Sequence, residues 1–171
     1  HELAQSLRRY LERRHALRRH RALVLRAGEA ERVRRQAQRA RELRRGLLRL
    51  GEGQAEAQLP QALNYDRAGL VSFRKGCYTG QEVVARLHYR GRAKKRWGLW
   101  QGRLAAAAVP GEKLADADGN ACAEVLRCVG DSTGTSWLAA LARVEDIGRP
   151  LRGAAGEALE PCALPYPVTE D

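Results

Sequence analysis

Between Arg96 and Val168 the sequence alternates short apolar segments with turn-forming residues, and this pattern restricts the fold more than any other feature. The expected turns lie at DADGN (116–120) and DSTGT (131–135), and VPGEKL (109–114) predicts a turn followed by a strand. The expected strands lie at WGLW (97–100), ACAEVLRCVG (121–130) and SWLAALARV (136–144). Three prolines, which exclude a helix near the end, are Pro161, Pro165 and Pro167. Four to six short strands at this spacing predict a small antiparallel barrel or sandwich over about residues 94–168.

Charge is distributed unevenly along the chain. Residues 1–50 hold 16 arginines and 5 glutamates, which accounts for the whole net charge of +11, whereas residues 51–171 hold 15 basic and 15 acidic side chains. Apolar residues at helical spacing, which predict a helix over about 29–50, are Val33, Ala37, Ala40, Leu43 and Leu47. Two interpretations of the arginines stay open: a surface that binds phosphates with salt-dependent affinity, or the solvated face of a helix.

The start of the chain gives weaker indications. Leu3, Leu7, Tyr10 and Leu11 follow helical spacing, and the apolar run at 21–25 is compatible with a strand. The sequence contains no methionine and begins with histidine, so we expect a piece or a processed form of a longer product. No run of about 18 apolar residues predicts a membrane span, and the arginine-rich N-terminus is unlike a secretory signal.

The four cysteines, Cys77, Cys122, Cys128 and Cys162, form neither a disulfide framework nor a metal motif. None belongs to a CxxC pair, and no histidine lies at metal-ligand spacing from any of them. If Cys122 and Cys128 share a strand, a rise of about 3.3 Å per residue separates them by about 20 Å, beyond the roughly 7 Å that a disulfide allows. We therefore expect reduced thiols, a cytoplasmic protein and no metal bound by this chain alone.

The stretch KGCYTGQE (75–82) places a cysteine just before an expected helix. Thr79 and Glu82 fit a capping box, in which the threonine caps the first turn and the glutamate reaches back to it. A helix is therefore predicted from about Gly80 to His88, with Gly91 as its stop signal.

Cys77 precedes this helix at the positive end of the helix dipole, and Arg74 and Lys75 are close in sequence. Positive potential favours the thiolate, the nucleophilic and metal-binding form of cysteine. The alternative is a small buried residue in a tight loop, because free cysteine usually lies in protein cores. His88 is the one candidate base in the helix, but the helical rise puts it about 12 Å or more from Cys77, so a protease-like pair is not expected.

Basic residues follow the helix start without an acidic residue among them. They are accompanied by the aromatic residues Tyr89 and Trp97, a combination typical of nucleic-acid surfaces. Arg86 opens this stretch, and the candidate nucleic-acid contacts are Arg90, Arg92, Lys94, Lys95 and Arg96. The alternative is a solvated strand edge, where lysine and arginine discourage aggregation.

The segments LPQALNYD (59–66) and KGCYTGQEVVARLHYRGRAKKR (75–96) resemble the YgfZ family, folate-binding proteins related to the glycine-cleavage T-protein, an aminomethyltransferase. The family's K-G-C-Y-x-G-Q-E motif is matched by Lys75, Gly76, Cys77, Tyr78, Gly80, Gln81 and Glu82. Further similar positions are Val84-Ala85-Arg86, Arg90-Gly91, Lys95-Arg96 and LPYP (164–167). The resemblance extends over about residues 40–168.

The resemblance implies an α+β fold. Residues 1–93 would be an N-terminally truncated part of the T-protein-like folate-binding domain, and residues 94–171 a small antiparallel C-terminal β-barrel. Tetrahydrofolate is the implied cofactor, and the implied role is the upkeep of iron–sulfur enzymes, including those that thiolate tRNA. Cys77 would be the essential catalytic residue, with Lys75 beside it. The implied folate contacts are Tyr78, Gly80, Gln81, Glu82 and Arg86.

Three functions stay open at this point. The leading hypothesis is a YgfZ-like accessory protein in which Cys77 handles a one-carbon, persulfide or iron–sulfur transaction. A true aminomethyltransferase is the second, and it would not need the motif cysteine. The third is a nucleic-acid-binding module that uses residues 86–96 together with the N-terminal arginines, with tRNA as its expected partner. The motif does not distinguish an enzyme from an accessory protein.

Overall fold

The structure, a computed structural model, describes residues 25–51, 54 and 57–168. The helical spacing predicted at the start of the chain and the apolar positions 21–24 lie outside these residues. By internal packing the chain falls into two compact units, of which one ends at Gln36 and the other begins at Ala37. The predicted domain boundary at 93/94 falls inside the second unit, and the assignment of family domains to 1–93 and 94–171 stays a prediction.

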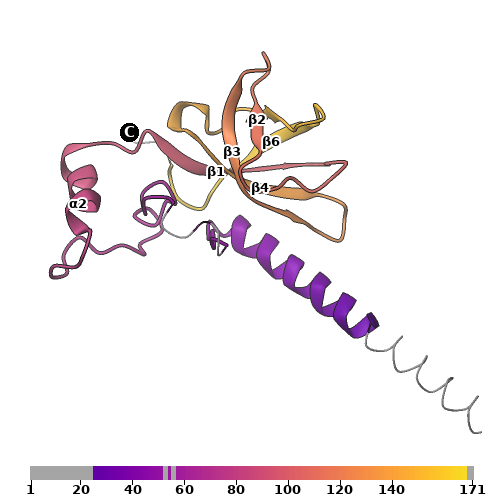
Figure 1. The fold of residues 1–171 in the computed structure, drawn as a ribbon, viewed down its shortest axis with the longest axis horizontal. Helices are drawn as coiled ribbons and strands as arrows, with labels where there is room; N and C mark the ends of the chain where they lie inside the picture. The colour runs from indigo at the N-terminus through magenta and orange to yellow at the C-terminus, as the bar shows by residue number, and fades with distance from the viewer. Residues whose placement is uncertain (1–24, 52–53, 55–56, 169–171) are drawn as a thin grey trace, which may run out of the picture. The chain divides into compact units, whose positions relative to one another are not determined.

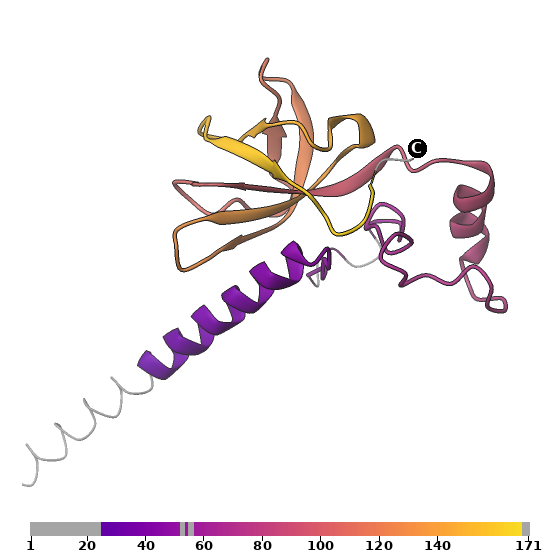
Figure 2. The same cartoon turned by 180° about the vertical axis from the view of Figure 1, so that it is seen from behind.

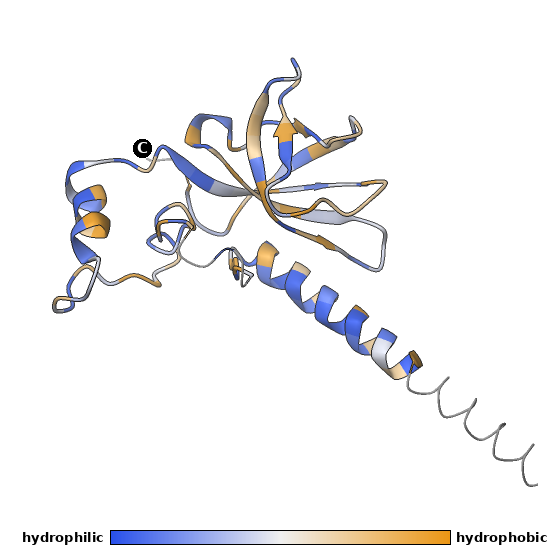
Figure 3. Ribbon diagram, viewed as in Figure 1, coloured by the Kyte–Doolittle hydropathy of each residue, from blue (hydrophilic) through white to orange (hydrophobic). Residues whose placement is uncertain are grey.

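Residues 25–44 are helical, which confirms the helix predicted at 29–50 over most of its length. The helix is mostly hydrophilic (Figure 3). In the first unit, none of residues 25–36 is buried, and Val33 is 46% exposed. Glu31 accepts a hydrogen bond of 2.8 Å from Arg35 one turn later, the spacing at which opposite charges support a solvated helix.

The second unit begins with the last turns of this helix and its C-terminal cap. Gly46 has a φ of +74°, its N–H donates to the Leu43 carbonyl at 2.9 Å, and the Leu47 N–H donates to the Glu42 carbonyl at 2.9 Å. This is the Schellman arrangement, which favours glycine because of its left-handed backbone. The Tyr166 hydroxyl donates to the Gly46 carbonyl at 2.6 Å, and burial raises the pKa of Tyr166 to about 12. The helix end is thus joined to the C-terminal segment.

Six antiparallel strands form a closed barrel in the second unit (Figures 1 and 2). The strands are β1 (Lys95–Gly102), β2 (Lys113–Ala115), β3 (Ala121–Gly130), β4 (Ser136–Arg143), β5 (Leu151–Arg152) and β6 (Ala158–Cys162). Their order is β1-β4-β3-β2-β5-β6, and β1 closes the sheet by pairing with both β4 and β6. The predicted barrel is confirmed. Together with the helices, it gives the chain an α+β fold. Within the described ranges, no helix combines the length and hydropathy of a membrane span.

Two aspartates organise the hairpin turns predicted on either side of β3. Asp116 Oδ1 accepts from the backbone N–H groups of Asp118 and Asn120, at 3.0 and 2.8 Å. Asp131 Oδ1 likewise accepts from the Thr133 N–H at 2.8 Å, and its Oδ2 accepts from the Trp137 indole at 3.0 Å. These hydrogen bonds favour the charged carboxylate, so the pKa values of both aspartates lie below the usual range. Both predicted turns are confirmed.

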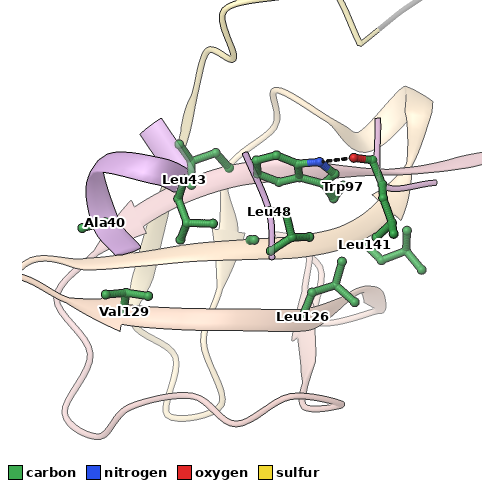
Figure 4. Close-up of a cluster of buried hydrophobic side chains, with 10 residues drawn as sticks. Ala40, Leu43, Leu48, Trp97, Leu126, Val129 and Leu141 are labelled. Carbon is green, nitrogen blue, oxygen red and sulfur yellow. Dashed lines mark hydrogen bonds between the residues drawn. The ribbon is translucent and has the colours of Figure 1, made fainter. Parts of the chain in front are cut away.

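Alternate strand residues serve two hydrophobic clusters, because successive side chains of a strand point to opposite faces. All six strands contribute to the interior cluster, which contains Trp100, Leu114, Ala123, Val125, Leu138, Ala140, Ala142, Leu151 and Leu159. The outer cluster contains Ala40, Leu43, Leu48, Leu63, Trp97, Leu99, Leu126, Val129, Ala139 and Leu141 (Figure 4). Ala40, Leu43, Leu48 and Leu63 therefore cover one outer face of the barrel and bury it.

Hydrogen bonds around Trp97 join the segment at 60–66 to β1. The Trp97 backbone N–H donates to the Ala62 carbonyl and its indole N–H to the Leu63 carbonyl, each at 2.8 Å. Asn64 donates from Nδ2 to the Trp97 carbonyl at 2.8 Å, is fully buried, and has a φ of +57° that asparagine tolerates better than most residues. The segment therefore acts as an irregular partner of the first strand.

Candidate functional site

The cysteine loop, defined as residues 75–80, leads into α2 (Gln81–Arg90). The Gln81 N–H donates to the Tyr78 carbonyl at 3.2 Å, and Gln81 Oε1 accepts from the Tyr78 N–H at 3.2 Å. These two bonds hold the turn between the loop and the helix. Cys77 is exposed just before this turn. The interpretation of Cys77 as a small buried residue is therefore wrong.

The helix predicted from Gly80 to His88 is confirmed, but its predicted cap is wrong. Gly80, not Thr79, is the N-cap, and no side chain makes a capping hydrogen bond. Gly80 has a φ of +80°, a conformation that favours glycine, and this bend displaces the helix start by one residue. Gln81 takes the part expected of Glu82 by reaching back to the loop backbone. The helix ends at Gly91, as predicted.

Lys75 and Tyr78 interact across the cysteine loop. The Lys75 Nζ lies 4.7 Å from the centroid of the Tyr78 ring, within the range of a cation–π contact. The contact brings together one residue on each side of Cys77, and both side chains are exposed. The loop therefore presents an accessible thiol, and the ammonium group of Lys75 belongs to a residue two positions earlier in the sequence. This arrangement suits nucleophilic sulfur chemistry.

The other three cysteines belong to the barrel. Cys122 and Cys128 lie on β3 and Cys162 ends β6; all are half-buried, and all four cysteines are free thiols, as predicted. Burial raises the pKa of the thiols of Cys122, Cys128 and Cys162. These thiols are therefore protonated and poorly nucleophilic at neutral pH. Within the described ranges, no group of three or more histidine, cysteine or acidic side chains is arranged to hold a metal ion.

We expect Cys77 to react with iodoacetamide at neutral pH faster than the three barrel cysteines by about an order of magnitude, because its thiol is exposed and theirs are shielded. Quenched time points digested and analysed by mass spectrometry give a rate for each cysteine. Cys77→Ser should remove the fast phase and leave the slow ones unchanged. Equal rates at all four cysteines of the folded protein would contradict the conclusion that Cys77 is accessible and the barrel cysteines are shielded.

Most of the predicted basic residues line a pocket of about 800 Å³ next to the start of β1. The lining residues are Arg92, Ala93, Lys94, Lys95, Arg96, Arg143, Val144, Glu145 and Val168. We call this the basic pocket. Lys94, Lys95 and Arg143 are exposed, and Arg143 is a contribution from the end of β4 that the sequence pattern did not indicate. Arg90 is exposed at the end of α2 and does not line the pocket.

Arg96 has a structural role instead of the predicted nucleic-acid contact. It is 2% exposed, and its guanidinium makes two hydrogen bonds of 2.9 Å to the carboxylate of Asp66. Its Nη1 also donates to the Gln61 carbonyl at 2.8 Å. All these partners lie in the segment that pairs with β1, so the donors of Arg96 are used within the fold and are turned away from solvent.

An aromatic group at α2 was not indicated as a site by the sequence. The His88 and Phe73 rings stack with centroids 3.6 Å apart, and Tyr89 meets both edge-on. Phe73 and His88 line a second pocket of about 450 Å³ together with Gln61, whose buried Oε1 has no hydrogen-bond partner among the described residues. The available signal was that Phe73 is the one phenylalanine of the chain. The His88 ring is engaged in this stack.

Four of the five predicted folate contacts are exposed, and Gln81 is half-buried. They lie on the cysteine loop and the first two turns of α2 and line none of the pockets described above. A pterin ring is bound by enclosing walls and convergent polar groups, as small-molecule ligands usually are. These residues do not enclose a ring system by themselves, so they do not fit folate as a complete site.

No protein-family profile matches the chain. Among curated proteins, it is similar to the tRNA-modifying protein YgfZ of Yersinia enterocolitica, with 39% identity over 120 residues that make up 66% of the chain. The chain belongs to the YgfZ family. This agrees with the family that the KGCYTGQE motif indicates. The chain spans 36% of the length of that YgfZ relative, so the activity, substrates and partners of a whole YgfZ protein are proposals here.

Proposed function

We propose that this chain is a YgfZ-like accessory protein in tRNA modification and that Cys77 is its reacting group. The observation that carries the proposal is the exposure of the Cys77 thiol in a loop held by the Tyr78–Gln81 hydrogen bonds, while the other three thiols are half-buried in the barrel. A cysteine that reacts with a large substrate needs an accessible sulfur, which the loop provides. The name of the Yersinia relative connects the family to tRNA.

Within this function, each residue of the loop has a proposed part. Cys77 takes part in a one-carbon, persulfide or iron–sulfur transaction through its sulfur. Lys75 stabilises negative charge near that sulfur, and its cation–π contact with Tyr78 restrains the ammonium. Gly80 gives the bend that keeps the thiol outside the helix. The proposed client proteins are iron–sulfur enzymes such as those that thiolate tRNA, in the cytoplasm.

Tetrahydrofolate is part of the proposal through family membership. The proposed contacts, Tyr78, Gly80, Gln81, Glu82 and Arg86, lie on the cysteine loop and the start of α2, and we assign no step of the chemistry to folate because they do not enclose it. Calorimetry with tetrahydrofolate on this chain and on Cys77→Ser tests the point. Equal micromolar binding by both would support folate as a ligand that Cys77 acts on. The absence of binding would remove folate from the function of this chain.

The test of the main proposal is Cys77→Ser, which changes the reacting atom and little else. We expect it to abolish the contribution of the protein to thiolated tRNA, measured by mass spectrometry of tRNA nucleosides from cells that depend on it. The free energy of unfolding should change by less than about 0.5 kcal/mol, because the side chain is exposed. Cys162→Ser is the matched control, and it should retain activity.

Retention of full activity by Cys77→Ser would contradict the proposal and favour the aminomethyltransferase alternative. That alternative predicts one-carbon transfer to tetrahydrofolate from an aminomethyl donor, which a formation assay for methylenetetrahydrofolate detects. Urea denaturation of the same variant measures its free energy of unfolding. This measurement separates a loss of activity caused by unfolding from the loss of a chemical role.

A second candidate function, RNA binding, is favoured by the basic pocket. Lys94, Lys95 and Arg143 surround about 800 Å³ with one acidic residue, Glu145, among the lining groups. Cationic side chains around a hollow attract phosphates, and each phosphate contact adds to the salt dependence of affinity.

We expect the double variant Lys94→Gln/Lys95→Gln to bind tRNA more weakly and to lower the slope of log affinity against log salt by about 1 to 2. Fluorescence anisotropy at several salt concentrations measures both quantities. Arg103→Gln is the control, because Arg103 is an exposed basic residue outside the basic pocket. An unchanged slope in the double variant would exclude the pocket as the RNA contact.

A further inference from the structure

Another cavity with a cationic lining lies on a different part of the second unit, where β3 meets the capped helix end. It has a volume of about 200 Å³ and is lined by Arg39, Glu42, Leu43, Leu47, Arg49, Leu50 and Arg127. We call it the Arg127 pocket. It shares no lining residue with the basic pocket or with the cysteine loop, so its role is independent of the function proposed above.

Positive charge in the Arg127 pocket exceeds the negative charge available to it. Glu42 is the one acidic residue in the lining, and both of its oxygens are engaged. Its Oε1 accepts from Gln38 at 3.2 Å, and its Oε2 lies 3.3 Å from the Nε of Arg49. Within the described residues, neither Arg39 nor Arg127 has an ion-pair partner.

Arg127 has a buried donor atom without a partner among the described residues. It is half-buried on β3, and its Nε is buried without a hydrogen-bond partner in the described part of the chain. Burial lowers the pKa of Arg127, the charge of Arg39 lowers it further, and Glu42 opposes these effects. A partly buried charge without a counter-ion is costly, so an anion bound at the guanidinium of Arg127 would stabilise this site.

The size and walls of the pocket restrict the anion. Small-molecule sites usually have volumes of about 300–1,000 Å³, so a pocket of about 200 Å³ suits a single functional group. Guanidinium groups match the geometry of phosphate oxygens through parallel N–H donors. Leu43, Leu47 and Leu50 supply the apolar part of the lining. We propose that the Arg127 pocket binds one phosphate group through Arg39 and Arg127.

The phosphate has two chemical sources, a free phosphate or phosphomonoester and a phosphodiester of an RNA backbone. Calorimetric titration with inorganic phosphate tests the site itself, with chloride at matched ionic strength as the reference. We expect saturable binding with one phosphate per chain. Arg39→Gln and Arg127→Gln should each weaken it at least about tenfold, the effect of losing one charge-assisted hydrogen bond.

Arg41→Gln is the matched control, since Arg41 is an exposed arginine of the same helical segment that does not line the pocket, and it should bind phosphate like the wild type. Arg39 is exposed, so Arg39→Gln keeps the test valid if Arg127→Gln fails to fold. Absence of saturable heat with the wild type, or equal binding by all variants, would overturn the proposal.

The same variants assign the source of the phosphate. If Arg39→Gln and Arg127→Gln weaken both phosphate binding and RNA binding, and Arg41→Gln does not, the pocket takes a backbone phosphodiester. If they weaken phosphate binding alone, it takes a free phosphate or phosphomonoester. Both results support the site, and both are independent of Cys77 activity, so failure of this inference is distinguishable from failure of the proposed function.

Discussion

Replacing Arg96 with methionine is expected to lower the free energy of unfolding by about 3–5 kcal/mol, a large share of the roughly 5–15 kcal/mol that stabilises most domains. Arg96 donates two hydrogen bonds of 2.9 Å to Asp66 and one of 2.8 Å to the Gln61 carbonyl. Methionine has no donor, so Asp66, whose side chain is 11% exposed, would keep a charge without a counter-ion. Urea unfolding followed by tryptophan fluorescence measures the loss.

Two companion variants separate the ion pair from other effects. Lys95→Met changes the neighbouring exposed residue of β1 and should alter the free energy of unfolding by less than about 0.5 kcal/mol. Arg96→Met combined with Asp66→Leu removes the unpaired charge and should recover part of the loss. A loss below about 1 kcal/mol for Arg96→Met alone would show that the pair is dispensable.

The pH dependence gives an independent check of the same pair. Burial raises the pKa of Asp66, but the hydrogen bond and charge of Arg96 outweigh it, so the pKa lies below its usual range. Such a carboxylate stabilises the fold above its unfolded-state pKa of about 3.9, and the contribution is lost as the pH falls through the folded-state value. The stability difference between wild type and Arg96→Met should therefore shrink as the pH falls below about 4.

The second large effect is expected at Trp97. Trp97→Ala should cost about 3–5 kcal/mol, because the ring is fully buried in the outer cluster and its removal leaves a cavity. Trp97→Phe keeps most of the apolar volume but leaves the Leu63 carbonyl without its indole donor, so about 1–3 kcal/mol is expected. Circular dichroism in urea measures both variants.

Trp137→Phe is a suitable comparison, because Trp137 is half-buried and its indole bonds to a turn aspartate instead of the covering segment. Its effect should be smaller than that of Trp97→Ala. If Trp97→Ala were no more destabilising than Trp137→Phe, the packing of Ala40, Leu43, Leu48 and Leu63 on the barrel would contribute little to its stability.

Local patterns in the sequence were sufficient to predict the barrel. The hairpin turns around Asp116 and Asp131 are specified by residues adjacent in sequence, and each aspartate folds back on its own turn. Helix α2, which precedes Gly91, was also predicted from residues adjacent in sequence. Its cap was not, because both Thr79 and Gly80 are compatible with a helix start, and the difference depends on the backbone conformation of Gly80.

The parts that were not predictable depend on contacts between distant residues. Arg96 belongs to a run of basic residues and differs from Lys95 through its partners Asp66 and Gln61, which lie 30 and 35 positions earlier. The Arg127 pocket joins a strand to a helix end far away in the chain. The exposure of Cys77 was likewise one of two open interpretations, because burial of a loop residue depends on what packs against the loop.

The pairing of β1 with β6 has a consequence for the order in which the protein folds during synthesis. β1 must pair with a strand that ends at Cys162, so the barrel cannot close until Cys162 has left the ribosome. Until then, the unpaired edge of β1 is open to other chains. Long-range strand pairing also slows folding, because the chain loses the entropy of loop closure before the strand contacts form and compensate for that loss. Nascent chains that stop before β6 should therefore be the aggregation-prone and chaperone-bound form of this protein.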